Sequence, residues 1–483
     1  MWRIVQRNWP VVPLLVLFGV LYSFTINSYG MFLWDESEYA SIGRSVLRGQ
    51  GFAIAGVPNK LRPPFLPLAG TAAMWLFGGE WDDSILRGTA SALALAALLC
   101  VYSFGASRVD RATGLVAAFL LGTTPFFWTF VPMFLSEIPF LTFFAAAVWL
   151  FYSGIYFDQR CFLWSWISCA LAFLTRHTAV LFFPVIFLFV CIAWWRGGPE
   201  VRGRLRSRAF FLSPLAGLLL FLPWLAREYF TFGNPLAGLQ EASHQLQVYL
   251  PGTSMPWNYY LSRLPFLLSP EIAALVVAGI IWACWKRDRF ALHNLLAATF
   301  ILTWFSCYRY KEDRIVSSAF PFLVMLVAIA LAKATAGFRP AARAAVLGAL
   351  LAGSLLVNLR ATRPVFANTF TLGYPGFLDA MVFLRENATP GATVLGANFP
   401  QIHWYSDLRA INIPEETALP EALRKSEWVV ITNFELVQKP YVLQMIKLIP
   451  NTPSRESAIF WDKECVTAVI RSDKLLQALR VPR

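Results

Sequence analysis

The sequence predicts an all-α polytopic membrane protein that ends in a C-terminal extracytoplasmic α/β domain. Composition is the first observation: of 483 residues, 57% are hydrophobic and only 14% are charged, whereas a soluble domain carries about 25% charged residues. The second is that apolar runs long enough to cross a bilayer recur along the chain and stop near residue 360. A soluble enzyme and a disordered chain are both excluded.

The apolar runs predict about eleven transmembrane helices. The expected spans are 10–29, 85–107, 112–131, 139–156, 161–175, 178–195, 209–226, 265–285, 291–307, 315–332 and 342–358. A shorter run at 65–78 is expected to be re-entrant or interfacial, and the sequence does not decide between the two. No convincing cleavage site follows residues 10–22, so the first span is expected to be retained.

The distribution of basic residues predicts the orientation. If 65–78 does not cross the bilayer, one side collects 16 basic and four acidic residues, and the 196–208 loop is its richest segment. The opposite loops hold 11 basic and 12 acidic residues. Because Lys and Arg are enriched in cytoplasmic loops, we expect a cytoplasmic N-terminus, an odd number of spans and an extracytoplasmic C-terminus. The net charge of +13 is thus mainly a topology signal, and no nucleic-acid partner is expected.

Three longer segments are expected outside the membrane. Two are loops at 30–84 and 227–264, within a transmembrane region at 1–359. The third is the domain at 360–483, whose apolar runs are short and whose charges are mixed. Its pattern predicts helices at 376–387 and 441–449, and strands at 392–397, 427–434, 457–461 and 465–470.

Several kinds of chemistry find no support in the motifs. The chain has no P-loop, no Gly-x-Gly-x-x-Gly fingerprint and no Cys-x-x-Cys pair. No strong acid or base lies in the middle of an expected span, although proton-coupled transporters usually need one. Direct use of a nucleotide is therefore not expected, and chemistry at the outer membrane surface is favoured over transport.

The first external loop opens with an acidic segment, Trp34–Tyr39, that contains Asp35, Glu36 and Glu38. Helical spacing of apolar residues follows. Asp35 and Glu38 fit a capping pattern, so an N-cap role for Asp35 is as well supported by spacing as a functional one. The functional alternative is a carboxylate that deprotonates an incoming hydroxyl at the membrane surface.

The same loop ends with Arg62 followed by Pro63 and Pro64. Interfacial basic residues usually contact lipid headgroups. The alternative is a phosphate ligand, because the prolines stiffen the segment and the guanidinium fork suits a phosphate. Further polar groups on this side are ordinary loop charges or parts of a site: Glu137, Arg176, Arg227 and Arg314.

These segments together resemble the polytopic GT-C glycosyltransferases, in the branch of protein O-mannosyltransferases and lipid A aminoarabinose transferases. The likeness extends over nearly the whole chain. It rests on the following segments: 35–40, 49–52, 62–65, 135–140, 174–177, 223–227, 232–235, Arg314 with 320–321, and 383–387.

The resemblance implies a GT-C fold and a sugar donor carried on a polyprenyl phosphate. It implies that Asp35 is the catalytic base, with Glu36 as its neighbour, and that Glu137 is a supporting acid. Arg62 matches the basic residue that holds the lipid phosphate. Arg176, Arg227 and Arg314 are further candidates for binding that phosphate. A divalent metal is also an option, although no ligand cluster demands one. Glu228 departs from the Asn often found after the family's Pro-Trp…Arg stretch.

We therefore expect an inverting glycosyltransferase of the plasma or inner membrane. Its acceptor would be a hydroxyl on a glycan, lipid or protein at the outer face. The rivals are a transporter or flippase of lipid-linked glycans and a non-catalytic glycan-binding protein of the same fold. The sequence does not specify the sugar, the acceptor, the metal dependence or the oligomeric state.

Overall fold

The computed structural model describes residues 9–26, 30–31, 33–248, 255–308, 311–371, 375–433, 440–450, 452–461 and 466–479. The chain divides into two compact units. Unit 1 comprises Met1–Ile26, Lys60–Leu66 and Arg87–Ala367. Unit 2 comprises Asn27–Asn59, Pro67–Leu86 and Asn368–Arg483. Most of the first external loop, which the sequence assigned to the transmembrane region, is thus grouped with the C-terminal residues.

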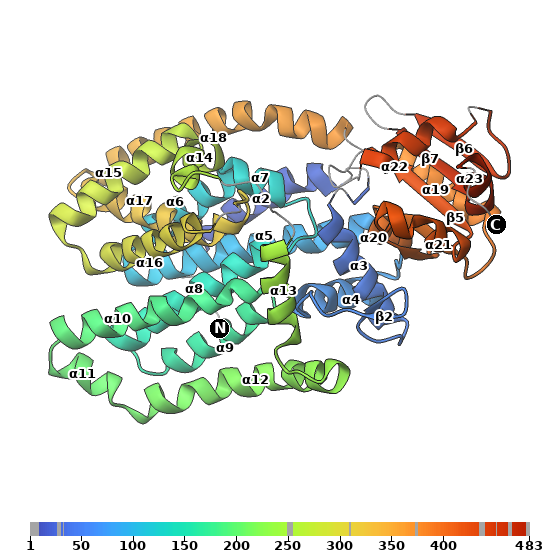
Figure 1. Cartoon of the computed structure of the whole chain (residues 1–483). Helices are drawn as coiled ribbons and strands as arrows, with labels where there is room; N and C mark the ends of the chain where they lie inside the picture. Colours follow the sequence, from blue (N-terminus) through green and yellow to red (C-terminus); the bar gives the residue numbers. More distant parts are fainter. Residues whose placement is uncertain are drawn as a thin grey trace. The chain divides into compact units, whose positions relative to one another are not determined.

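Unit 1 is built from helices (Figure 1). They are α2 (Val11–Ile26), α5 (Asp83–Arg108), α6 (Arg111–Thr123), α7 (Pro125–Phe130), α8 (Glu137–Tyr156), α9 (Cys161–Phe173), η1 (His177–Leu181), α10 (Phe182–Arg196), α11 (Pro199–Leu205), α12 (Arg208–Phe232), α13 (Ala237–Val248), α14 (Tyr259–Leu268), α15 (Pro270–Lys286), α16 (Arg289–Ser306), η2 (Ile315–Ala319), α17 (Phe320–Ala334) and α18 (Pro340–Thr371). The start of α5 and the end of α18 are grouped with unit 2.

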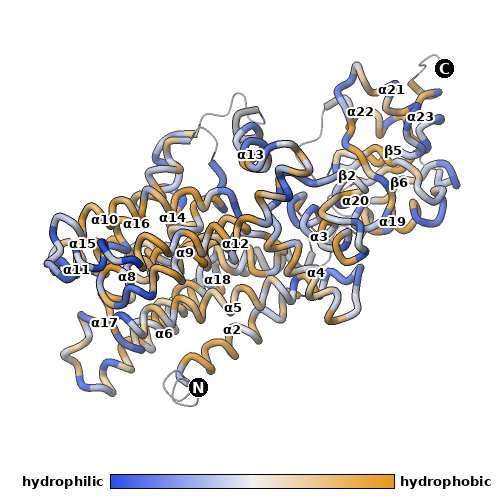
Figure 2. Tube along the Cα trace, turned by 90° about the horizontal axis from the view of Figure 1, so that it is seen from below, coloured by the Kyte–Doolittle hydropathy of each residue, from blue (hydrophilic) through white to orange (hydrophobic). Residues whose placement is uncertain are grey.

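All eleven predicted apolar runs fall on these helices. Within the described residues, six helical segments are long and apolar enough to cross a membrane, or seven if the bent pair α14–α15 counts as one span. Four shorter apolar helices accompany them, and one of these is the 65–78 segment, which forms α4 (Phe65–Phe77). Figure 2 shows hydrophobic residues along helices such as α8 and α10, whereas α11 and α13 are more hydrophilic.

Two predicted spans are not single helices. The 265–285 span is broken at Ser269, where α14 and α15 meet at 117° and the backbone has φ 85°. The 112–131 span is broken at Thr124, which caps α7. A proline follows each break, and proline disfavours the helical conformation of the residue before it and lacks a backbone donor. The prediction of unbroken helices was therefore wrong at both places.

The core of unit 1 lies around α8 and α17. In the apolar stretches of these two helices, 83% and 89% of the residues are buried, compared with 11% in the apolar stretch that contains α12. Helices α5 and α6 approach each other closely. A Cβ atom added to Gly105 would lie only 2.7 Å from the Cα of Gly114. The exposed apolar face of α12 is consistent with contact to lipid rather than to protein.

The C-terminal part of unit 2 is a five-stranded sheet in the order β4-β3-β5-β7-β6, with helices on both faces (Figure 1). Strands β4, β3 and β5 are parallel, and β7 and β6 join antiparallel. The strands are β3 (Thr393–Gly396), β4 (Arg409–Ile411), β5 (Trp428–Thr432), β6 (Ser457–Trp461) and β7 (Val466–Arg471). The helices are α19 (Pro375–Asn387), α20 (Phe399–Ser406), η3 (Glu416–Ala418), α21 (Leu419–Arg424), α22 (Pro440–Met445), η4 (Ile446–Leu448) and α23 (Ser472–Ala478).

Alternate residues of β5 serve the two faces of this sheet. Trp428 and Val430 pack with α19 and α20, whereas Val429 and Ile431 pack with α21, α22 and α23. A strand covered on both faces reads as a continuous apolar run, which is why the sequence indicated it. Of the expected strand at 465–470, residue 465 lies outside the described residues.

The first-loop part of unit 2 consists of α3 (Trp34–Leu47), the hairpin β1 (Ala53–Ile54) and β2 (Val57–Pro58), and α4. The hairpin turns through Ala55 and Gly56, which both have positive φ. Helix α3 packs against α20 of the sheet domain and against β1. Unit 2 therefore joins two segments that lie more than 300 residues apart in the sequence.

Candidate functional site

The first-loop acids Asp35 and Glu36 occupy the first turn of α3. Helix α3 begins after Leu33, whose backbone is extended, and Glu36 Oε2 accepts a hydrogen bond of 2.9 Å from the Leu33 N–H. Carboxylates at this position are stabilised by the positive end of the helix dipole. The N-cap interpretation of Asp35 was wrong, because Leu33 is the N-cap residue and Glu36 makes the capping contact.

The two acids differ in their surroundings. Glu36 is completely buried and is committed to the start of the helix, whereas Asp35 is half-buried. Residues Glu36–Ser45 of α3 are all buried. Of the two, Asp35 is therefore better placed to meet a substrate hydroxyl, and Glu36 holds the turn that carries it.

In unit 1, Glu137 is the centre of a cluster of charged side chains. It opens α8 and is 1% exposed. Arg176 Nη1 donates to Glu137 Oε1, and Arg314 Nη1 lies 3.6 Å from the same oxygen. Arg314 also pairs with Glu312. The structure thus brings together three residues that the sequence singled out in separate loops.

The Arg62 segment lies beside this cluster. The N–H of Phe65 donates to the carbonyl of Leu174 at 2.8 Å, and His177 Nε2 lies 3.2 Å from the carbonyl of Leu61. The guanidinium groups of Arg62 and Arg176 both interact electrostatically with the His177 ring. The charges of Arg62 and Arg176 therefore both act on one imidazole.

Arg227 is held by its neighbour Glu228, which is 1% exposed. Arg227 Nη1 donates to Glu228 Oε1, and the N–H of Gly238 donates to Glu228 Oε2 at 3.0 Å. Glu228 also interacts electrostatically with Lys60, which itself pairs with Glu241 at 3.3 Å. The departure from Asn at this position thus has a structural role, since Glu228 links Arg227 to the first turn of α13.

Close backbone packing explains why these segments stay together. A Cβ on Gly238 would lie 2.7 Å from the carbonyl oxygen of Lys60 and 3.3 Å from the His177 ring. The 60–65 segment, the hairpin at 174–177 and the start of α13 therefore share one small volume. The side chains of Arg176, Arg227 and Arg314 are each only 21–22% exposed. Each arginine is pre-ordered by a carboxylate and retains some access to solvent.

The predicted site residues are divided between the two units. Unit 1 contains Glu137 and the four arginines, and unit 2 contains Asp35 and Glu36. Among the described residues, no group of three or more His, Cys, Asp or Glu side chains is arranged to hold a metal ion.

The sequence matches one protein family and two relatives from Pseudomonas. Residues 61–226 match the family described as dolichyl-phosphate-mannose-protein mannosyltransferase. An undecaprenyl phosphate-alpha-4-amino-4-deoxy-L-arabinose arabinosyl transferase from Pseudomonas fluorescens is 24% identical over 80% of this chain and 68% of its own length. A transferase of the same name from Pseudomonas aeruginosa is 27% identical over 63% of this chain, and the match covers 56% of that relative.

The fold matches solved structures over most of the chain. ArnT from Cupriavidus metallidurans bound to undecaprenyl phosphate has a TM-score of 0.70 at 13% identity, covering 95% of this chain and 98% of that one. The resemblance to the GT-C glycosyltransferases is confirmed. The oligosaccharyltransferase of Archaeoglobus fulgidus also has this fold, with a TM-score of 0.60 at 13% identity over 87% of this chain and 69% of that one.

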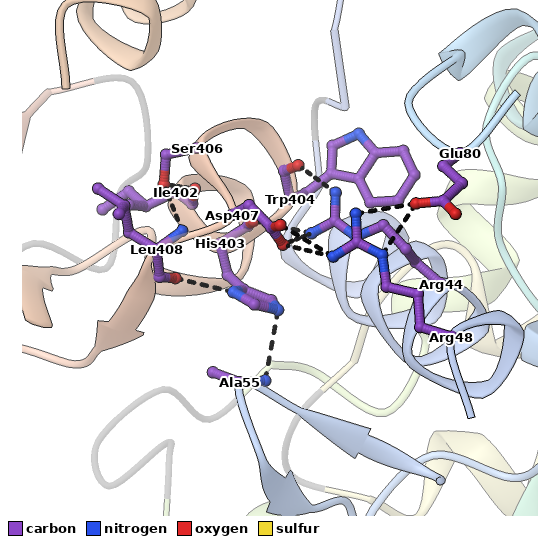
Figure 3. A network of polar contacts seen from close by, with 10 residues as sticks. All are labelled: Arg44, Arg48, Ala55, Glu80, Ile402, His403, Trp404, Ser406, Asp407 and Leu408. Carbon is purple, nitrogen blue, oxygen red and sulfur yellow. Dashed lines mark hydrogen bonds and ion pairs between the residues drawn. The ribbon is translucent and has the colours of Figure 1, made fainter. Parts of the chain in front are cut away.

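Sequence reasoning missed one group of residues in unit 2. Arg44 of α3 and Arg48, the C-cap residue of this helix, contact Trp404 and Asp407 of the sheet domain (Figure 3). Asp83, the first residue of α5, accepts hydrogen bonds from Trp404 and Tyr405. The one available signal was the four-residue spacing of the two arginines on an acidic helix, which places both on one face.

Proposed function

We propose that this protein is an inverting glycosyltransferase that moves a sugar from a polyprenyl phosphate to an acceptor hydroxyl on the outer face of the membrane. The donor class is supported by the names of the two Pseudomonas relatives, which specify undecaprenyl phosphate. The membrane location is supported by the membrane-capable helices of unit 1. The acceptor is a glycan, a lipid or a protein.

The observation that carries the proposal is the set of arginines around Glu137. Arg176 and Arg314 share one carboxylate oxygen, and the charges of Arg62 and Arg176 both act on the ring of His177. Ordered guanidinium groups stabilise negative charge without reorganising during the reaction. We infer that they bind the donor phosphate and neutralise the charge that grows on it as the sugar departs.

The reaction then follows from the two kinds of group. Asp35 removes the proton from the acceptor hydroxyl, whose oxygen attacks the anomeric carbon. The bond between that carbon and the phosphate oxygen breaks, and its electron pair leaves with the polyprenyl phosphate. Attack opposite to the leaving group inverts the anomeric configuration. Arg62, Arg176, Arg227 and Arg314 act on the phosphate, whereas Glu137 orders two of them.

Transfer by the purified enzyme from an undecaprenyl-phosphate sugar tests the base. Asp35→Asn removes the proton acceptor while keeping the side-chain size, so the rate of transfer should fall by about 10²-fold or more. Glu38→Gln is the matched control, because it neutralises another acid of the same helix. Full activity of Asp35→Asn would refute the assignment of the base.

Donor binding tests the arginines separately. Arg62→Ala should weaken the binding of undecaprenyl phosphate about tenfold, and Arg62→Lys should weaken it less, because the charge remains. Arg202→Ala, in the basic loop assigned to the other side, is the control of equal charge. An unchanged affinity of Arg62→Ala would remove this residue from the phosphate site. Binding of donor without any transfer to any acceptor would favour the non-catalytic alternative.

A further inference from the structure

We propose that the C-terminal sheet domain contributes to catalysis indirectly. Its contacts hold helix α3 in the position that the carboxylates of α3 need. Arg44 is the main positioning residue. This inference rests on the proposed function of Asp35 as the base. It concerns contacts within unit 2, where α3 and the sheet domain belong to one compact body.

Helix α3 is unusual because its buried surface is polar. Six of its ten consecutive buried residues are charged or are serines: Glu36, Ser37, Glu38, Ser41, Arg44 and Ser45. Burying polar groups is costly unless they are hydrogen-bonded. Apolar packing therefore contributes less to fixing this helix than it does in α8 or α17, and specific polar partners must define its position.

Arg44 supplies the most directional of these contacts, and it is 1% exposed. Its Nη1 donates to the carbonyl of Trp404 at 2.7 Å, and its Nη2 donates to the carbonyl of His403 at 2.9 Å (Figure 3). These carbonyls lie in the last turn of α20, where backbone acceptors lack a full set of intrahelical partners, and the His403 carbonyl also accepts the N–H of Asp407. Arg44 thus caps the C-terminus of α20, where a positive charge is favoured by the helix dipole.

Two indole rings fix the plane of the Arg44 guanidinium. Its central carbon lies 3.9 Å from the centre of the Trp81 ring and 4.7 Å from that of Trp404. Burial lowers the pKa of Arg44 to about 10, with Asp407 opposing that effect. The side chain therefore keeps its charge at neutral pH, and a flexible ammonium could not reproduce both carbonyl bonds and the stacking.

Arg48 extends the same contact one helical turn further. Its Nη1 donates to Asp407 Oδ2 at 2.8 Å, and its Nε donates to Glu80 Oε2 at 2.8 Å (Figure 3). Asp407 Oδ1 also lies 3.4 Å from Arg44 Nη2. One carboxylate of the sheet domain therefore contacts both Arg44 of α3 and Arg48 at the end of that helix.

The other end of α3 is held as well, next to the proposed base. The ring of Trp34, the residue before Asp35, packs edge-on against Phe399 at 4.8 Å between centroids. The N–H of Met31 donates to Tyr405 Oη at 2.6 Å, and Tyr405 in turn donates to Asp83. Helix α20 thus contacts α3 at both ends and determines where Asp35 lies.

Small displacements of a catalytic group have large kinetic consequences, since a shift of about 1 Å can cost about 10²-fold in rate. Loosening the sheet-domain contacts should therefore reduce turnover without removing a group that binds donor. This expectation separates positioning from a merely structural role, which would lower the amount of folded enzyme but not its kcat.

The test uses Arg44→Lys and Asp407→Asn in the full-length enzyme. Arg44→Lys keeps the charge but loses the forked pair of guanidinium donors. The kcat per folded molecule should then fall about tenfold, with the KM for donor unchanged. Asp407→Asn, which tolerates the same left-handed backbone (φ 61°), should reduce kcat about threefold and remains informative if Arg44→Lys folds poorly. Glu421→Gln is the matched control, because it breaks an exposed ion pair in the same domain and should leave kcat unchanged.

A double-variant comparison shows whether the effect passes through the base. If Asp407 acts by positioning Asp35, Asp407→Asn should not slow the residual transfer of the Asp35→Asn enzyme any further. An unchanged kcat in both single variants, or a full additional loss in the double variant, would overturn the positioning role. Full activity of Asp35→Asn would instead refute the proposed base. The kcat of Asp407→Asn alone would then decide whether the sheet domain affects turnover.

Discussion

Glu137 holds two arginines close together through one carboxylate group. Its carboxylate is buried at the start of α8, where it faces Arg176 and Arg314 at one oxygen. Its second oxygen is buried without a hydrogen-bond partner among the described residues. A buried charge of this kind depends on its cationic partners, and they depend on it for their orientation.

Neutralising this acid should therefore be costly. We expect Glu137→Gln to reduce the free energy of unfolding by about 2–4 kcal/mol, because breaking a buried pair leaves charge uncompensated, and to raise the KM for donor. Glu241→Gln, which affects the more exposed Lys60 pair, should cost less than about 1 kcal/mol. Thermal unfolding and transfer kinetics of the two variants give the comparison, and equal losses would contradict it.

His403 links the first-loop hairpin to the sheet domain through its neutral form. Its Nδ1 lies 2.8 Å from the carbonyl of Leu408, to which it donates, and its Nε2 accepts from the N–H of Ala55 at 3.3 Å. Burial lowers the pKa of His403, the Leu408 hydrogen bond opposes this effect, and the charge of Arg44 adds to it. Protonation of Nε2 would remove the acceptor that Ala55 needs.

The pH dependence of stability follows from that direction. The unfolded chain has the ordinary histidine pKa of about 6.5, so it takes up this proton at a higher pH than the folded chain does. The contribution of His403 is thus present above about pH 6.5 and is lost as the pH falls below that value. Melting curves between pH 7.5 and 5 should show a smaller decrease in Tm for His403→Gln than for the natural protein, and identical decreases would refute this role.

Helix α3 also depends on a close backbone approach to α4. A Cβ on Gly43 would lie 2.9 Å from the carbonyl of Pro67 and 3.2 Å from Met74, and Thr71 donates to the carbonyl of Gly43 at 2.9 Å. No larger residue fits without moving one of the two helices. The helix that carries Asp35 is thus located by α4 as well as by α20.

Gly43→Ala should therefore destabilise the protein by about 1–3 kcal/mol, as overpacking typically does, and should lower transfer activity. Gly348→Ala is the control, because that helical glycine has open space around it and alanine favours helix. A thermal-shift assay should give changes of opposite sign, and a Gly43→Ala variant as stable as the natural protein would show that α4 can yield.

The sequence was informative about helices because apolar runs are a local signal. Every expected span lies on a helix, and the β5 run Trp428–Thr432 was recognised as a buried strand. The breaks at Ser269 and Thr124 were not predicted, because the apolar runs continue on both sides of Pro270 and Pro125. Local patterns thus established the element types better than their bends.

The site was predictable only in part, for a related reason. Short motifs in a known order identified Glu137, Arg176 and Arg314, and the structure brings these three together. Nothing local indicated that Arg44 meets residues 403 and 404, because that contact joins positions about 360 residues apart. The same holds for Asp83, whose partners also lie in the distant sheet domain.

At the scale of the whole molecule, the charge distribution predicts a membrane topology that reporter fusions can test. The basic loop around α11 should be cytoplasmic and the sheet domain extracytoplasmic, since Lys and Arg are retained on the cytoplasmic side. A fluorescent-protein fusion after Leu205 should therefore fluoresce, and an alkaline-phosphatase fusion after Leu479 should be active. The reverse pair of results would show that α4 crosses the bilayer or that the number of spans is even.

The pairing of α3 with α20 also has a consequence for biosynthesis. At about 5–20 residues per second, roughly 20–70 s separate the synthesis of Arg44 from that of its acceptors, which lie about 360 residues later. During that interval the acidic helix has left the ribosome but cannot yet be fixed. A nascent or truncated chain would therefore carry the proposed base without holding it in place, and we expect the proposed transfer only once the sheet domain has been made.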